Sequence, residues 1–478
     1  MADKCTSEMR KMPGGFQFIS IQANGQVKDR ATRRRARSHA VKTALGKRRK
    51  EQQLARTNFI VKTVEDPHLH LKIDNSAGTA KPCTVHDAGL SAPLHSPVSG
   101  ALDPFQTLAV DSSRLQALLD DYRARQAPEP VFSVAEELAF QNFRSVFRTG
   151  FHDPALINAV MLAFAFAVTS GNLNPECLRY QSQAVAYIRQ RMDSEDEAAS
   201  EATIGAILLI AGVAGRLGQT TQVELHMGAV QQLLSVCQRK SIHLTAGIKR
   251  AIFWQDLNCS LLAGSKRIVN HATFATLFWA RDTFVPDNYR LPLGFESQRY
   301  ILDPEFSAVL EDLHALQCIR NLPRPPHADA IGMLHINNHT ASIQSRLMIF
   351  SSLSPVQECC RLAAYLCSIT LCCKIWCELV LPSHISSQLL FKVQEMCKDG
   401  ATAIRDCFDL LVWLLYIGGA FAPVGLARDR YLDLLLAICP DLSWPELHAY
   451  LRRYIWSDDA FLVPVSALWR EVVHYPSR

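Results

Sequence analysis

Residues 153–171 carry the signals of a buried helix, and they constrain the fold more than any other part of the chain. Asp153 favours the position just before a helix, and Pro154 suits the first helical position, where its missing N–H removes no hydrogen bond. The residues that follow are apolar on nearly every face, and Gly171 lies just beyond the expected last turn. A helix without a polar face must be covered by other elements. The sequence therefore predicts a central helix inside a larger core.

Helix signals recur along the chain, whereas the alternation of apolar and polar residues that marks strands is scarce. Apolar residues three or four apart between Val223 and Cys237 predict an amphipathic helix. Further helix starts are indicated at three places: Ser133 with Glu136, Asn174 with Pro175, and Ser443 with Pro445 and Glu446. We therefore expect an all-α fold, an irregular bundle or array of antiparallel helices with short connections.

Two stretches interrupt this pattern. Several prolines between Arg281 and His327 predict a looser segment, which either wraps the core or separates two helical lobes. Residues 410–427 form a run of 18 without a charge, at the lower edge of the length that spans a membrane. Gly418, Gly419 and Pro423 interrupt this run. We expect a core helix followed by a turn, and no membrane partner.

The positive charge of the chain is concentrated near its N-terminus. Residues 1–60 hold 15 of the 50 Lys and Arg but only 4 of the 45 Asp and Glu, so they carry +11 and the remainder carries −6. Residues 28–50 alone contain eleven Lys and Arg beside one Asp. Such a segment stays hydrated or meets a polyanion. We expect residues 1–102 to be a disordered basic arm and linker, and residues 103–478 to form the helical domain.

The basic residues of the arm form two clusters. The first consists of Arg33, Arg34, Arg35 and Arg37, and the second of Lys47, Arg48, Arg49 and Lys50. Their spacing is typical of a two-part nuclear import signal, the role that we rank first. A nucleic-acid arm that binds phosphates without reading sequence ranks second, and a merely hydrated tail third. A leucine zipper is not indicated, because Pro67 interrupts the heptads that would continue from Leu54.

The Cys and His residues do not form a recognisable metal site. No secretory signal precedes the 15 Cys, which indicates reduced thiols. Six Cys lie between Cys359 and Cys377 in an apolar stretch that reads as helix, but none forms a Cys-x-x-Cys pair. We predict that they are small buried apolar residues. His335 and His339 are four residues apart but lack a Glu and a third ligand nearby, so we predict structural or surface histidines, no metal and no cofactor.

Sequence motifs of common enzyme classes are missing. The chain has no phosphate-binding loop, no dinucleotide fingerprint, no nucleophile elbow and no zinc-protease motif. Arg250 and Trp254 fall one turn apart on a predicted helix and are interpreted as a structural pair at the rim of the core. We therefore expect no catalytic residue and no enzyme. Catalytic groups assembled from distant parts of the chain remain an alternative.

Several segments, in their order along the chain, resemble the fungal-specific transcription factor domain. They are Asp103–Phe105, Glu224–Gly228, Lys249–Asp256, Pro292–Phe295, Cys360–Leu366, Trp413–Ala420 and Tyr454–Trp456. Together they spread over residues 103–469. Residues 16–40, with FQFI followed by RRRARSHA, are similar to the opening of members that lack the zinc cluster.

The resemblance implies a nuclear regulator of transcription by RNA polymerase II. A binuclear zinc cluster requires six Cys thiolates, but only Cys5 and Cys83 precede Asp103. DNA contact would then be lost, replaced by the basic arm or supplied by a partner. The expected partners are DNA or chromatin, an import receptor, other transcription proteins, and a second copy or a related chain in a dimer. A non-catalytic interaction scaffold stays open as the alternative function.

Overall fold

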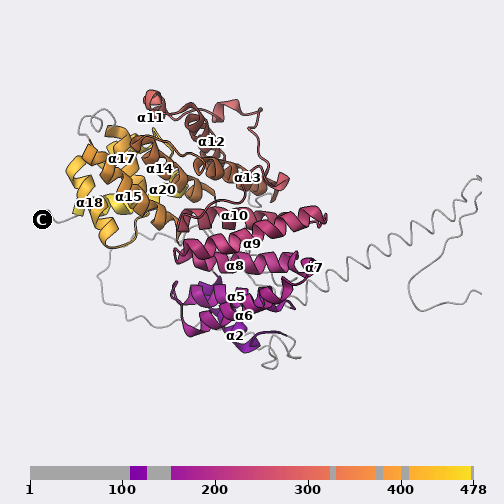
Figure 1. Ribbon diagram of the computed structural model, residues 1–478. Coiled ribbons are helices and arrows are strands. Elements are labelled where there is room, and N and C mark those ends of the chain that lie inside the picture. Colours follow the sequence, from indigo (N-terminus) through magenta and orange to yellow (C-terminus); the bar gives the residue numbers. More distant parts are fainter. Residues whose placement is uncertain (1–107, 126–151, 323–329, 373–379, 400–407, 475–478) are drawn as a thin grey trace, which may run out of the picture. The chain divides into compact units, whose positions relative to one another are not determined.

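The computed structural model describes residues 108–125, 152–322, 330–372, 380–399 and 408–474. All of them belong to one unit, residues 93–478. Within these ranges every regular element is a helix, which confirms the all-α expectation (Figure 1). The expected basic arm lies outside the described residues, and so does the helix predicted to begin at Ser133.

The helix predicted after Asp153 is present as α5 (Pro154–Val168). The side chain of Asp153 accepts a hydrogen bond from the backbone N–H of Leu156, at 2.9 Å. Every residue from Ala155 to Phe166 is buried. Gly171 adopts φ 85°, a left-handed conformation that glycine tolerates best. The local sequence signals therefore predicted both the limits and the central position of this helix.

The N-terminal helices of the unit pack around α5 and α8. The helix α5 packs against α6 and α8, and α8 packs in turn against α9 and α10. The expected amphipathic helix is α9, with Val223, Met227, Val230 and Cys237 buried on one side. The bounds of these elements are α2 Ser112–Asp120, α3 Tyr122–Arg125, α6 Pro175–Arg191, α7 Glu195–Ala198, α8 Glu201–Arg216, α9 Thr220–Arg239 and α10 Ala246–Ala263.

Short helical turns replace long helices between α10 and α12. They are η2 Ala275–Leu277, η3 Pro286–Asn288, α11 Leu293–Glu296 and η4 Arg299–Ile301. The looser stretch predicted from Arg281 to His327 is therefore present only as far as Asp303. The prediction is wrong for residues 304–321, because Pro304 is the first residue of α12 (Pro304–Asn321) and Asp303 caps that helix. Residues 323–327 lie outside the described residues.

The C-terminal helices pack around α14 and α17. The helix α14 contacts α12, α13, α15 and α17, and α17 also contacts α15, α18, α19 and α20. A contact between α10 and α15 joins them to the N-terminal helices. Their bounds are α13 Ala330–Leu347, α14 Pro355–Cys372, α15 Leu381–Asp399, α17 Phe408–Ala420, α18 Leu426–Ile438, α19 Trp444–Leu451 and α20 Asp458–His474.

The uncharged run that begins at Leu410 is a core helix followed by a turn, as predicted. Its helix, α17, is buried from Leu410 to Gly419. Pro423 lies in the turn after it, where its ring cannot disturb the helix. In the part of the chain that the structure describes, no helix combines the length and the apolar character needed to span a membrane.

Candidate functional site

The eight residues singled out by the sequence lie outside the described residues, so their contacts stay predictions. They are Arg33, Arg34, Arg35, Arg37, Lys47, Arg48, Arg49 and Lys50. Within the described part, buried polar and charged side chains gather where residues 264–291 contact α10, α12 and α13. We call residues 264–291 the connecting segment.

A buried carboxylate on α10 fastens the start of the connecting segment. Asp256 accepts a hydrogen bond from Arg267 Nε at 2.6 Å, and its oxygens also accept from the backbone N–H groups of Ile268 and Val269. Burial raises the pKa of Asp256, while the charge of Arg267 opposes that shift. Gly264, at φ 66°, ends α10 and turns the chain toward these contacts.

Arg250 joins α10, α13 and the connecting segment. Its guanidinium donates to the side-chain oxygens of Asn337 and Asn338, each at 2.7 Å, and to the backbone carbonyl of Thr276 at 2.5 Å. Trp254, one turn further along α10, donates from its indole N–H to the same oxygen of Asn337 at 3.4 Å. The two residues interpreted as a structural pair thus converge on one asparagine.

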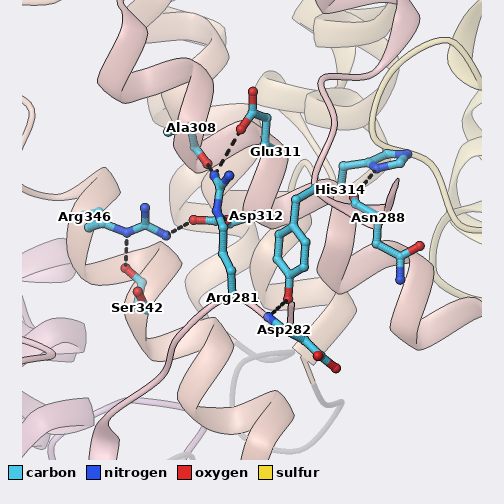
Figure 2. Close-up of polar contacts among 10 residues, drawn as sticks. Arg281, Asp282, Asn288, Ala308, Glu311, Asp312, His314, Ser342 and Arg346 are labelled. Atoms are coloured by element: carbon cyan, nitrogen blue, oxygen red, sulfur yellow. Dashed lines mark hydrogen bonds and ion pairs between the residues drawn. The ribbon is translucent and has the colours of Figure 1, made fainter. Parts of the chain in front are cut away.

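A second buried carboxylate, on α12, binds two arginines from different elements (Figure 2). Asp312 is 1% exposed. Its Oδ1 accepts from Arg281 Nε of the connecting segment at 2.7 Å, and its Oδ2 accepts from Arg346 Nη2 of α13. Arg281 also donates to Glu311 Oε2 at 3.1 Å and to the Ala308 carbonyl at 3.0 Å. Burial raises the pKa of Asp312, and the two guanidinium groups oppose this.

Two further hydrogen bonds hold the end of the connecting segment (Figure 2). The hydroxyl of Tyr289 accepts from the backbone N–H of Asp282 at 2.9 Å. His314 on α12 donates from Nδ1 to the backbone carbonyl of Asn288 at 2.9 Å. Together with the contacts of Asp256, Arg250 and Asp312, these bonds show that hydrogen bonds and ion pairs attach much of the connecting segment to the helices.

His339 on α13 is fully buried and stacks on Trp279 of the connecting segment. The ring centroids are 4.0 Å apart and the planes differ by 8°. Burial lowers the pKa of His339 to about 3, and His335 and Arg346 add to the effect. The main-chain carbonyl of Asp312, which contacts this ring, opposes the shift.

The described cysteines of the predicted cluster behave as apolar core residues, in agreement with the sequence. Cys359, Cys360, Cys367 and Cys372 are all buried on α14, whereas Cys373 and Cys377 lie outside the described residues. Burial raises the pKa of Cys359 to about 12 and also raises that of Cys367. The described ranges contain no group of three or more His, Cys, Asp or Glu residues that could hold a metal ion.

Three of the segments that carry the resemblance meet in one aromatic cluster. Phe295 contacts Trp413 and Tyr454 edge to face, with centroids 5.3 Å and 5.0 Å apart, and Trp413 stacks on Tyr454 at 5.4 Å. The indole N–H of Trp413 donates to the Ile455 carbonyl at 3.2 Å. The packing of distant helices therefore accounts for these aromatic residues.

Sequence reasoning missed the ion pairs of Asp312 and the stack of His339 on Trp279. Asp312 offered a signal, because it stands among apolar residues of α12 that are buried, such as Leu310 and Leu313. Its partners, Arg281 and Arg346, offered no such signal, because they lie 31 and 34 positions away from Asp312 along the chain. These contacts hold the connecting segment in place. The two buried carboxylates, Asp256 and Asp312, are already neutralised by guanidinium groups.

No protein-family model, curated protein or solved structure matches this chain. The likeness to the fungal-specific transcription factor domain rests on the segments named above and on no aligned relative. The function of this chain must therefore be argued from the chemistry of its own residues.

Proposed function

We propose that this chain is a nuclear regulator of transcription by RNA polymerase II, and that it acts by binding partners rather than by catalysis. The division of charge carries the proposal, since residues 1–60 hold 15 Lys and Arg against 4 Asp and Glu in a chain whose totals are 50 and 45. So basic a segment attracts nucleic acid and import receptors, which bind positively charged peptides. The resemblance supports transcription over other nuclear roles.

The two basic clusters have two successive tasks in this proposal. The clusters around Arg33–Arg37 and Lys47–Lys50 bind an import receptor, and in the nucleus their charges neutralise DNA phosphates. Phosphate contacts position a protein on DNA but do not select a sequence. A partner protein, or a dimer with a related chain, therefore selects the promoters.

The helical unit supplies contacts to other transcription proteins. Two large side chains of the connecting segment, Phe278 and Phe284, are 73% and 92% exposed. Aromatic side chains are enriched at the centres of protein interfaces, and such exposure supports a role in partner binding. These residues are thus candidates for recruitment, separate from the basic arm.

Chromatin immunoprecipitation of the tagged chain tests the proposal. We expect enrichment at a defined set of promoters for the full chain. The comparison is a variant without residues 1–60 that carries an unrelated import signal, so that loss of import and loss of DNA contact are separated. A signal that disappears in this variant assigns DNA contact to the arm, and one that persists assigns recruitment to the helical unit.

Three outcomes would contradict the proposal or part of it. A full chain that accumulates in the nucleus without enrichment at any locus would favour a scaffold that has left transcription. Turnover of a substrate that depends on one Cys, His or Asp would favour an enzyme. A chain excluded from the nucleus regardless of its basic clusters would refute the import role of residues 33–37 and 47–50.

A further inference from the structure

Residues 278–290 of the connecting segment lie between two buried apolar side chains. Leu277 is fully buried and Leu291 is 8% exposed, whereas no residue of the fully described stretch between them is buried. Its regular structure is limited to the single turn η3. Segments with few buried apolar contacts open locally at a lower free-energy cost than the core around them. The two leucines thus fix the ends of a stretch that has little apolar burial of its own.

Contacts within this stretch join its two halves through Tyr289. The guanidinium of Arg281 lies over the Tyr289 ring, 5.4 Å from its centroid, and the ring of Trp279 lies 6.3 Å from the same ring. The Tyr289 hydroxyl accepts a hydrogen bond from the backbone N–H of Asp282 at 2.9 Å. Because each of these contacts depends on the others for its geometry, the stretch should form and open cooperatively.

On α12, an ion pair and a hydrogen bond hold the stretch (Figure 2). Arg281 donates to Asp312 Oδ1 at 2.7 Å and to Glu311 Oε2 at 3.1 Å. His314 donates to the backbone carbonyl of Asn288 at 2.9 Å. The side chain of Arg281 is 41% exposed, so water can replace its partners without leaving a buried guanidinium unpaired.

On α13, the stretch is held by one further hydrogen bond and by a ring stack. The side-chain amide of Asn338 donates to the Phe278 carbonyl at 3.0 Å. The ring of Trp279 stacks on His339 at 4.0 Å. Since His339 is fully buried, Trp279 forms part of its cover.

Asp312 keeps a second guanidinium when Arg281 leaves. Arg346, which belongs to α13 and not to the connecting segment, donates to Asp312 Oδ2 (Figure 2). Removing one partner of a buried ion pair is costly when it leaves the other charge uncompensated. Here one cation stays beside the carboxylate, so this cost of opening is avoided.

The part of the connecting segment before Leu277 is attached more firmly. Asp256, which is 1% exposed, accepts from Arg267 and from two backbone N–H groups. Opening there would withdraw three donors from one buried carboxylate. Arg250 also holds the Thr276 carbonyl, at 2.5 Å. The polar contacts therefore divide the segment into a fixed part and a part that can open.

We propose that residues 278–290 form a lid, which opens from α12 and α13 as one cooperative unit while residues 264–277 stay attached. Opening breaks the stack on His339 and the ion pair with Asp312. The lid itself does not depend on the role of the chain in transcription. It carries the exposed Phe278 and Phe284, so in that role its state would set how these rings are presented to a partner, and this consequence alone rests on the proposed function.

Fluorine NMR of the full chain labelled with 5-fluorotryptophan tests the lid at Trp279, whose signal is the one that Trp279→Phe removes. Saturation transfer should detect a minor state in which the stack on His339 is broken. Arg281→Gln and His314→Phe each remove a contact made by another part of the lid. Each should raise the population of the minor state by about fivefold or more, because opening is cooperative.

Two further variants separate a lid from loosened packing. Arg346→Gln removes the cation that stays beside Asp312, so it should lower the minor population, whereas loosened packing would raise it. Arg299→Gln breaks an exposed pair with Glu296 outside the lid and should leave the population unchanged. Circular dichroism and urea unfolding of each variant show that it is folded before the populations are compared.

Several results would overturn the proposal. These are the absence of a minor state at Trp279 in both the unchanged chain and Arg281→Gln, no response to His314→Phe, or a rise in Arg346→Gln that equals the rise in Arg281→Gln. Hydrogen exchange gives one more. If the N–H groups bound by Asp256 became exposed at the same rate as the lid opens, the motion would belong to the whole connecting segment.

Discussion

Gly294 packs against the ring of Tyr454 so closely that a Cβ atom added to it would lie 2.5 Å from Cζ of that ring. Its backbone N–H also donates to the Arg453 carbonyl at 2.7 Å. The short helix α11 is thus held against the residues that follow α19, beside the rings of Phe295 and Trp413. A residue without a side chain is therefore required at position 294 for a steric reason.

Replacement of Gly294 by Ala should therefore destabilise the helical unit. The added methyl group has no room beside the ring, and overpacking of this kind lowers the free energy of unfolding by about 1–3 kcal/mol. Urea unfolding followed by circular dichroism measures the change. Gly228→Ala is the control, because a Cβ at this position of α9 has nothing within 4 Å. Equal stability of both variants would contradict the steric argument.

The Asp312→Asn substitution should lower the free energy of unfolding by about 1–3 kcal/mol, because it removes the charge of a buried carboxylate that two partly exposed guanidinium groups bind. Its partners, Arg281 and Arg346, come from two other elements, so the connecting segment should also become more accessible to proteases. The control is Glu296→Gln, which breaks the exposed pair with Arg299 and should change stability by less than about 1 kcal/mol. Similar losses in both variants would show that burial does not decide the effect.

Stability should fall when the pH is lowered below the ordinary range of a histidine. The pKa of His339 is about 3 in the fold against 6.5 ordinarily, so between these values the unfolded chain binds a proton that the folded chain does not. The contribution is fully present above pH 6.5 and is lost toward lower pH, by at most about 1.4 kcal/mol per pH unit. Arg281, Arg346 and His335 face this ring and oppose its protonation.

Urea unfolding at several pH values between 7.5 and 5 measures this dependence. His339→Phe should flatten the slope, while His448→Phe, which changes a partly exposed histidine on α19, serves as the comparison. An unchanged slope in His339→Phe would mean that this imidazole is solvated or paired in solution.

Cys359 and Cys367 should resist alkylation in the folded protein. Both are buried on α14, and burial raises the pKa of each thiol, which removes the reactive thiolate. Mass spectrometry after treatment with N-ethylmaleimide at pH 7.5 should find both unmodified, and both modified in urea. The half-buried Cys318 and Cys397 should react sooner. Rapid labelling of Cys367 without unfolding would contradict its place in the core.

Duplex DNA binding should be strongly salt-dependent and insensitive to sequence. Each phosphate that a basic side chain neutralises contributes about −0.9 to the slope of log affinity against log salt. Replacing residues 47–50 by Gln should therefore make the slope less steep by up to about 4, as measured by fluorescence anisotropy. Changing Arg239 and Lys240, which already pair with Glu195 and Asp196, should have little effect. A slope unchanged by the first variant would refute a role of this cluster in DNA contact.

Predictions from the sequence were most accurate where one short stretch carried the whole signal. Asp153, Pro154 and Gly171 defined α5, and the break at Pro423 distinguished a core helix from a membrane span. The prediction of a looser stretch was wrong for residues 304–321, since prolines were interpreted only as interruptions. Pro304 instead opens α12, because a proline at the first position of a helix disturbs no hydrogen bond.

The sequence by itself determined the all-α class, the starts of helices such as α5, α6 and α19, the buried character of the described cysteines on α14 and the uneven distribution of charge. These follow from neighbouring residues, through capping, the helical period and the cost of burying charge. Only the tertiary structure decided that Asp312 would bind Arg281 and Arg346, and that His339 would stack on Trp279. Both arrangements require side chains from separate elements to meet, and the local pattern of a chain contains no information about which distant residue will lie opposite.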